Sequence, residues 1–199
     1  MAANTRERLL EIALELFAER GFDGVSIAVI ADRLGLSKQA LLHHFDSKEK
    51  LYGELLARIS RDFEVRVREL DPGVNDVEAL ADMFTALAAD SMQHHAQTAL
   101  LMRELLDNRE RAGRAGRWYL EPFLALLVER VQALPQWRGV AREEAAAAAY
   151  QILGAINYFA ISAATLRGMW GETHYAAVED AFPAQLRRSV IAILARTQD

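Results

Sequence analysis

Hydrophobic positions recur at intervals of three and four residues along most of this 199-residue chain. That spacing is typical of amphipathic α-helices. The first helix is predicted to begin at a capping box made by Asn4 and Glu7 and to end at Gly21. No segment alternates between apolar and polar residues for the length of a strand, so we expect no β-strand.

Two short helices joined by a tight turn are predicted next. Ser26 should cap the first of them, Gly35 should end it, and Ser37 should cap the second. Leu41 and Phe45 are four residues apart and should pack inward. The side chains expected to face away are Gln39, Leu42 and His43. Two helices joined this closely form a helix-turn-helix, whose second helix can enter the DNA major groove.

Longer helices fill the rest of the chain. Asp46 and Ser47, followed by Glu49, should cap a fourth helix that runs to Leu70. The later helices are expected at Val77 to about His95, Ala99 to Asn108, Trp118 to Leu134, Glu143 to Arg167, and Pro183 to Arg196. Loops are expected at residues 113–116, 135–137 and 168–171. The predicted fold class is therefore all-α, with a helix-turn-helix domain at 1–50 and a larger helical domain at 51–199.

The charge distribution limits which partners the protein can bind. The formal net charge is −5, so a protein that binds polyanions over its whole surface is excluded and any nucleic-acid contact must be local. The three lysines, Lys38, Lys48 and Lys50, lie in or just after the second helix of the pair, and no acidic residue occurs from Arg33 to Phe45. The absence of cysteine excludes disulfides and thiolate metal sites and fits a reducing cytosol.

One segment has the length of a membrane span. Residues 145–166 carry no charge, but nine of them are alanine and polar side chains interrupt the others. Transfer of such a segment into lipid would be weakly favourable at best. With no signal peptide visible at the amino terminus, we expect a cytoplasmic protein.

The amino-terminal quarter resembles the signature of the tetracycline-repressor (TetR/AcrR) family of transcriptional regulators. The matching pieces are the segments 21–27, 30–31, 36–38, 44–45 and 47–49, together with Leu41 and Leu51. A pattern of several parts at fixed spacing is far more specific than one short motif. The resemblance implies a homodimeric regulator, usually a repressor, that leaves a palindromic operator when a small molecule enters the larger domain.

The resemblance also implies roles for individual residues. Ser26 and Lys48 would meet phosphates at helix starts, and exposed amides at helix starts do attract phosphate. Lys38, Gln39 and Ala40 would approach base edges, where glutamine can pair with adenine. His43 and His44 would contact the DNA backbone. Leu42 and Ala28 stand where the family often has tyrosine and arginine, so the operator sequence cannot be borrowed from a relative.

The larger domain is expected to supply the dimer surface and the effector pocket. The resemblance implies dimerisation through the last two helices, and two stripes of small or branched residues allow close helix approach. These stripes are Ala145, Ala149, Ile152, Ile156, Ala160 and Ala163, and then Leu186, Val190, Ile193 and Leu194. The same stripes also fit the core of a monomer. Aromatic and polar side chains suggest a pocket for a hydrophobic or aromatic molecule, lined by Phe84, Met92, Met102, Trp118, Tyr119, Phe123, Tyr150, Asn157 and Tyr158.

No cofactor or metal is expected. His94 and His95 are adjacent and point about 100 degrees apart on a helix, so they would not easily chelate one ion together. A pair at a helix end that satisfies carbonyls or contacts ligand is the preferred reading. Four arginines at 109, 111, 114 and 117 fit a solvated loop better than an anion site.

Two alternatives remain open at this point. One is an all-helical enzyme with a vestigial helix-turn-helix, although no Ser-His-acid trio or glycine-rich phosphate loop is recognisable. The other is a ligand-binding or scaffold protein whose helices serve only protein or ligand partners. A change in DNA affinity on effector binding would distinguish a regulator from both alternatives. Induction requires the effector to favour the state that does not bind DNA. The fourth helix, which joins the two expected domains, is the natural lever.

Overall fold

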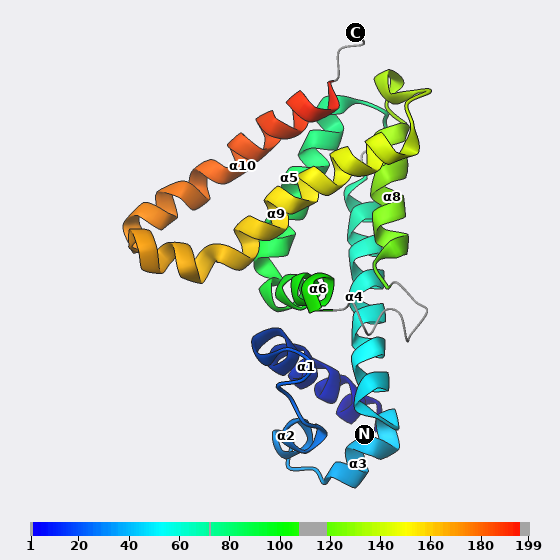
Figure 1. The fold of residues 1–199 in the computed structure, drawn as a ribbon, viewed down its shortest axis with the longest axis vertical. Coiled ribbons are helices and arrows are strands. Elements are labelled where there is room, and N and C mark those ends of the chain that lie inside the picture. Colours follow the sequence, from blue (N-terminus) through cyan, green and yellow to red (C-terminus); the bar gives the residue numbers. More distant parts are fainter. Residues whose placement is uncertain (1, 72, 108–118, 196–199) are drawn as a thin grey trace. The chain divides into compact units, whose positions relative to one another are not determined.

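The computed structural model describes residues 2–71, 73–107 and 119–195. Within these ranges every regular element is a helix, so the all-α prediction is confirmed (Figure 1). The elements are α1 (Ala2–Arg20), α2 (Ile27–Asp32), α3 (Lys38–Phe45), α4 (Lys48–Leu70), α5 (Val77–Gln93), α6 (His95–Asp107), α8 (Glu121–Gln132), the 3-10 turn η1 (Pro135–Trp137), α9 (Arg142–Trp170) and α10 (Glu172–Leu194).

The chain divides into two compact units. The amino-terminal unit comprises Met1–Arg61 and Ala96–Tyr119, and the carboxy-terminal unit comprises Asp62–His95 and Leu120–Asp199. The division therefore falls inside α4 and differs from the expected boundary at residue 50. It also assigns α6 to the unit that holds the helix-turn-helix, which the sequence pattern did not indicate.

Hydrogen bonds at the helix starts confirm most of the predicted boundaries in the amino-terminal unit. The hydroxyls of Ser26, Ser37 and Ser47 accept from backbone N–H groups three residues later, at 3.3, 3.1 and 3.1 Å. Gly35 adopts a left-handed conformation with φ of 65° and ends the preceding turn. The predicted capping box at Asn4 is wrong, because α1 already begins at Ala2.

The helices of the amino-terminal unit share one small core. Leu9, Ile30 and Leu41 are each fully buried, which brings α1, α2 and α3 together. On the outside, Arg6 pairs with Glu54 and so ties α1 to α4. The Arg6 guanidinium also lies 4.7 Å from the centre of the Phe45 ring. The core and these contacts fix how α3 is presented.

The carboxy-terminal unit is a set of packed helices in which α9 and α10 lie against α5, and α9 also lies against α8. Arg187 of α10 donates to the carboxylates of Asp82 and Glu78 in α5, at 2.6 Å each. The indole of Trp137 donates to the Leu194 carbonyl at 2.9 Å and anchors the end of α10. These contacts hold the carboxy-terminal half of α10.

A tight hairpin joins α9 to α10. Gly171, with φ of 79°, is the single residue between the two helices (Figure 1). The expected loop at 168–171 is therefore helical up to Trp170, and the expected helix start at Pro183 is wrong by eleven residues. Pro183 lies inside α10. Proline inside a helix costs free energy because it removes one backbone hydrogen bond. The ring packing of the neighbouring Phe182 offsets this cost.

Aromatic rings fill the inside of this hairpin. Phe159 of α9 stacks on Phe182 of α10 with centroids 3.8 Å apart, and on Tyr175 at 6.3 Å. Tyr175 is 1% exposed and its hydroxyl donates to Glu179 at 3.0 Å. Arg167 lies 4.4 Å from the centre of the Tyr175 ring. The hairpin therefore has a small core of its own.

α9 is the one helix among the described residues that is long and apolar enough to cross a membrane by length and composition. Its most apolar window has a mean hydropathy of 1.2, and 44% of that window is buried in the unit. Core helices of soluble proteins pass the same test, so this is weak support for a span.

We expect Tyr175→Ala to lower the free energy of unfolding by roughly 3–5 kcal/mol, as for other buried aromatic rings. Tyr175→Phe keeps the ring and loses one hydrogen bond, so its cost should be only about 1 kcal/mol. Urea unfolding followed by circular dichroism measures both. Equal losses for the two variants would show that the hydroxyl, and not ring packing, supports the hairpin.

Alkaline pH should destabilise the hairpin through the same residue. Burial, and then the hydrogen bond to Glu179, raise the pKa of Tyr175 above its ordinary value. A pKa raised on folding contributes stability that is present below the unfolded pKa, of about 10, and is lost as the pH rises through the folded pKa. Urea midpoints from pH 8 to 11 should fall more steeply for the wild type than for Tyr175→Phe, and identical slopes would contradict this.

Candidate nucleic-acid interface

The outer face of α3 carries the residues that the sequence assigns to DNA. Lys38, Gln39 and His43 are exposed, whereas Ala40, Leu42 and His44 are half-buried. Leu41 and Phe45 point into the core as predicted, at 0% and 3% exposure. The capped start of α3 thus presents a short helix with one cation and one amide at its exposed amino-terminal end.

An open depression lies beside this face, at the start of α2. Its volume is about 490 Å³, and its lining combines backbone and small side chains with two lysines and one acid: Asp23, Gly24, Val25, Ser26, Ile27, Ala28, Val29, Lys38 and Lys48. The structure therefore brings Ser26, Lys38 and Lys48 to one place. Exposed amides at a helix start together with lysine ammonium groups are the chemistry that binds a phosphate oxygen.

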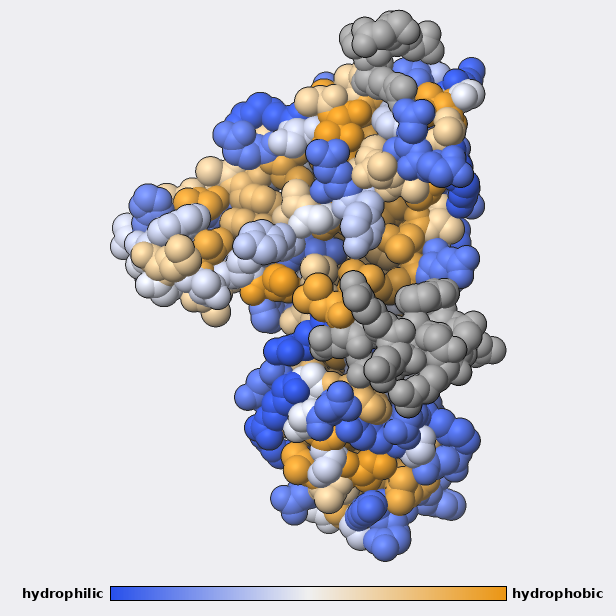
Figure 2. Space-filling view, viewed as in Figure 1, coloured by the Kyte–Doolittle hydropathy of each residue, from blue (hydrophilic) through white to orange (hydrophobic). Residues whose placement is uncertain are grey.

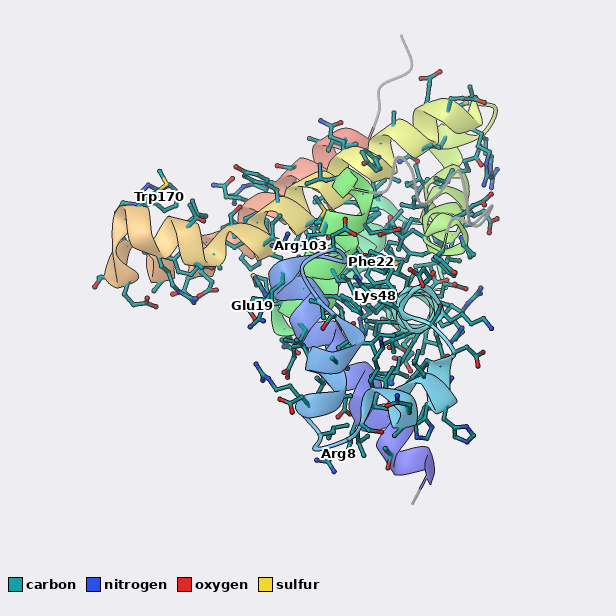
Figure 3. The ribbon with its side chains drawn as sticks, turned by 60° about the horizontal axis from the view of Figure 1, so that its bottom comes forward. Arg8, Glu19, Phe22, Lys48, Arg103 and Trp170 are labelled. Atoms are coloured by element: carbon teal, nitrogen blue, oxygen red, sulfur yellow. The ribbon has the colours of Figure 1, made fainter. Side chains whose placement is uncertain are left out.

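Lys48 is held by an aromatic ring. Its Nζ lies 4.1 Å from the centre of the Phe22 ring, a distance at which a cation is attracted to the ring face. Figure 3 shows Phe22 and Lys48 side by side. Phe22 in turn contacts Tyr52 edge-on at 4.9 Å and Phe17 at 6.0 Å. The ring thereby limits where the ammonium group can lie.

Lys50 differs from the other two lysines. Its Nζ donates to the Asp46 carboxylate at 2.7 Å, four residues earlier. The hydrogen bond and the charge of Lys50 hold the pKa of Asp46 below its ordinary value. Asp46 itself has a positive φ of 60° at the corner between α3 and α4. Lys50 therefore serves this corner and does not line the depression.

Two contacts of this unit were not foreseen from the sequence, and both come from α6. Arg103 donates to the carbonyls of Ala18 and Glu19 at 2.8 and 3.0 Å. The Tyr52 hydroxyl donates to the Glu104 carboxylate at 2.8 Å, with both residues buried. The partners are about 50 to 85 residues apart in sequence, and no local pattern signals such pairs.

The residues expected to line an effector pocket are divided between the two units. Phe84 and Phe123 are buried in the carboxy-terminal unit, where Phe123 lies 5.3 Å from Phe63, and Met92 is half-buried there. Met102 and Tyr119 belong to the amino-terminal unit, and Trp118 lies outside the described residues.

Three expected pocket residues lie on α9. Tyr150 and Tyr158 are 57% and 70% exposed, which does not support a place for them in a pocket of the single chain. Asn157 is half-buried. Of the expected pocket residues in the carboxy-terminal unit, Phe84, Met92, Phe123 and Asn157 are therefore the ones that are buried or half-buried.

The stripes of small residues expected at the dimer surface lie mainly in the core of the chain itself. Ala145, Ile152 and Ile156 of α9 are at most 1% exposed, and Ala149 and Ala160 are also buried. In α10, Leu186, Val190 and Leu194 are buried, while Ala163 of α9 and Ile193 are half-buried. The burial of most of these side chains favours the alternative that the stripes are core of the single chain, while Ala163 and Ile193 keep part of their surface exposed.

His94 closes α5 in the way preferred for a helix-end histidine. Its Nδ1 lies 3.0 Å from the Asp90 carbonyl oxygen and 3.1 Å from the Asp90 carboxylate. Asp90 also pairs with Arg66 at 3.1 Å. Across the described ranges, no group of three potential ligands is close enough to hold a metal ion. The arginine-containing loop at 109–117 lies outside those ranges.

Comparison with known proteins gives a family for the amino-terminal residues. The profile described as bacterial regulatory proteins, tetR family, matches residues 9–55. The repressor KstR2 of Mycobacterium tuberculosis is 37% identical over 100 residues, which is 50% of each chain. The regulator UidR of Escherichia coli is 30% identical over 107 residues, 54% of this chain and 55% of UidR. The chain thus matches about half the length of these relatives.

Solved structures extend the similarity in fold to almost the whole chain. A TetR-like regulator from Rhodococcus sp. RHA1 has a TM-score of 0.66 at 20% identity and covers 96% of this chain and 97% of its own. FadR from Bacillus subtilis, solved with stearoyl-CoA, has a TM-score of 0.69 at 16% identity, with coverage of 97% and 99%. The profile match and the curated relatives show similarity to the tetR family of bacterial regulatory proteins in part of the chain, at residues 9–55 for the profile, and the solved structures show the same fold over almost the whole chain.

Proposed function

We propose that the protein is a homodimeric DNA-binding transcriptional regulator, a repressor that a small hydrophobic or aromatic molecule releases from a palindromic operator. The observation that carries the proposal is the depression where Lys38, Lys48 and the capped start of α2 meet beside the exposed face of α3. The tetR-family profile match at residues 9–55 includes Lys38 and Lys48, and the relatives KstR2 and UidR are named a repressor and a regulator. Such a regulator acts in the cytoplasm and catalyses no reaction.

The proposed contacts follow from side-chain chemistry. Lys38 and Lys48, with the amides at the start of α2, bind phosphates and set the position of the protein on the duplex. For Lys38, which lines the depression, this replaces the base-edge role that the family resemblance implies. Gln39 reads a base edge, because its amide can donate and accept at adenine. Leu42 is half-buried and adds apolar contact with a thymine methyl. His43 and His44, in the last turn of α3, approach the DNA backbone.

The dimer surface is proposed on the outer side of α9 and α10. Both helices bury one side against the unit, and the opposite side carries exposed small residues at helical spacing. The exposed stripe on α9 is Ala147, Gln151, Gly154 and Tyr158, and the stripe on α10 is Ala177, Ala181, Ala184 and Arg188; the small residues among them are the four alanines and Gly154. The surface over these helices is largely apolar or weakly polar in Figure 2. Two copies of such a face allow close helix packing around a two-fold axis.

Effector binding is proposed within the carboxy-terminal unit. Phe63, Phe84 and Phe123 supply apolar surface there, and Arg66, Asp90 and His94 supply polar groups. An effector that weakens DNA binding by two orders of magnitude must prefer the state that does not bind DNA by about 3 kcal/mol. α4 runs from the amino-terminal unit into this one and is the proposed lever.

We expect Lys38→Ala and Lys48→Ala each to weaken binding to a duplex selected from a random-sequence pool. Each should also reduce the slope of log affinity against log salt by about 0.9, because one phosphate contact is lost. Fluorescence anisotropy from 50 to 300 mM KCl measures both quantities. Binding that is insensitive to salt and to both substitutions would refute the proposed interface.

The matched control is Lys50→Ala. It removes the same charge two residues from Lys48, but Lys50 is paired with Asp46 outside the depression. Its salt slope should therefore stay close to that of the wild type. A loss equal to that of Lys48→Ala would mean that general positive charge, and not the site at α2, governs binding.

Gly154→Arg should convert the dimer into a monomer without unfolding it. A Cβ atom added at Gly154 would meet no atom within 4 Å outside the local backbone, and arginine is a better helix former than glycine. Its bulk and charge would nevertheless keep two α9 helices apart. Sedimentation velocity gives the oligomeric state, with Glu129→Arg on the exposed side of α8 as a control that should stay dimeric. A dimeric Gly154→Arg variant would place the interface elsewhere.

A further inference from the structure

The carboxyl end of α1 is capped by a side chain from α6. The last carbonyls of a helix lack partners within the helix and carry partial negative charge. Gly21 N–H donates to the Phe17 carbonyl at 2.9 Å, and the next two carbonyls, of Ala18 and Glu19, accept from Nε and Nη2 of the Arg103 guanidinium. This fork fixes the point at which the chain turns towards Phe22.

The residue next to Arg103 holds a second element of the same unit. Glu104 accepts a hydrogen bond from the Tyr52 hydroxyl at 2.8 Å, and the two side chains are 8% and 4% exposed as residues. Tyr52 belongs to α4, one turn after Lys48. Two adjacent residues of α6 therefore hold the end of α1 and the first turns of α4.

Phe22 links these two sets of contacts into one closed path. It follows the capped turn at Gly21, contacts the Tyr52 ring at 4.9 Å, and lies under the Lys48 ammonium group at 4.1 Å. The path runs from Arg103 through the end of α1 to Phe22, then through Tyr52 to Glu104 and back to Arg103. Figure 3 shows Arg103, Phe22 and Lys48 on this part of the unit. Lys48 is the one member of the group that lines the depression.

We infer that Arg103 and Glu104 are positioning residues for DNA binding: they hold Phe22 and Tyr52 so that Lys48 is placed for a phosphate. Neither residue lines the depression, and both act through the aromatic rings. α6 is thus part of the phosphate-binding apparatus although it lies more than 40 residues after the helix-turn-helix. The inference rests on the proposed DNA-binding function of Lys48.

A double-mutant comparison tests the inference with the full-length protein and the selected duplex. Arg103→Met should weaken binding at 100 mM KCl by about tenfold and lower the salt slope by about 0.9, as expected for one lost phosphate contact. Arg103→Met combined with Lys48→Ala should be no weaker than Lys48→Ala alone, because both changes remove the same contact. Additive losses, or an Arg103→Met affinity within twofold of wild type, would overturn the inference.

Conservative variants separate positioning from charge and from stability. Arg103→Lys keeps the charge but not the fork, so it should restore only part of the affinity. Glu104→Gln keeps an acceptor for Tyr52 and should bind like the wild type, whereas Glu104→Leu should resemble Arg103→Met.

Arg61→Met removes an exposed arginine elsewhere in the unit and should leave the salt slope unchanged. Full restoration by Arg103→Lys would reduce the role of Arg103 to long-range charge and overturn the inference.

NMR supplies a readout that needs no DNA. The chain has three lysines, so a sample labelled with carbon-13 lysine gives three sets of side-chain signals. The methylene protons of Lys48 should be shifted upfield by the Phe22 ring, and Arg103→Met or Tyr52→Phe should reduce that shift while Lys38 and Lys50 stay unchanged. An unaltered Lys48 shift would overturn the inference. Suppose that Arg103→Met reduced the Lys48 shift but Lys48→Ala left the DNA affinity unchanged. The proposed phosphate contact of Lys48 would then be wrong, whereas the placement of Lys48 by Arg103 would be confirmed.

Discussion

The amino-terminal unit depends on the contacts among Phe17, Phe22 and Tyr52. Phe17 is fully buried and meets the Tyr52 ring edge-on at 5.0 Å, while Phe22 touches both rings from the surface side. Edge-on contacts between rings are more directional than the packing of aliphatic side chains. Because Phe22 also carries Lys48 on its outer face, the same rings that close the core fix a surface cation. One group of side chains therefore both closes the core and holds the Lys48 ammonium group in place.

The carboxy-terminal unit uses aromatic rings differently. Phe159, Tyr175 and Phe182 pack between two helices that have few other neighbours at the hairpin, and Arg167 covers the group from outside. Charged pairs from Arg187 to α5 hold the more central part of α10 at the surface. Exposed ion pairs contribute little to stability, so the rings carry most of the support at the hairpin.

Sequence patterns predicted the features that depend on residues close together in the chain, such as helix caps and buried helix positions. The caps at Ser26 and Ser37 span three residues and need no distant partner, and the inward positions of Leu41 and Phe45 follow from helical periodicity alone. Periodicity did not show which partner covers an apolar face, so the stripe at Ala145 to Ala160 was assigned to a second copy instead of to α5 and α8. Pro183 was read as a helix start because tertiary packing, which overrides its cost, is invisible locally. Arg103 and Glu104 could not be found, since their partners lie far away in sequence.

The hairpin at Gly171 has a consequence for how the length of α9 and α10 can vary. One left-handed glycine joins the helices, so no loop is available to absorb an inserted residue. One extra residue in α9 would rotate everything beyond it by about 100° and turn the outer stripe toward the core. Insertions of three, four or seven residues nearly restore the register. Natural length changes in this hairpin should therefore come in whole helical turns, with matching changes in both helices.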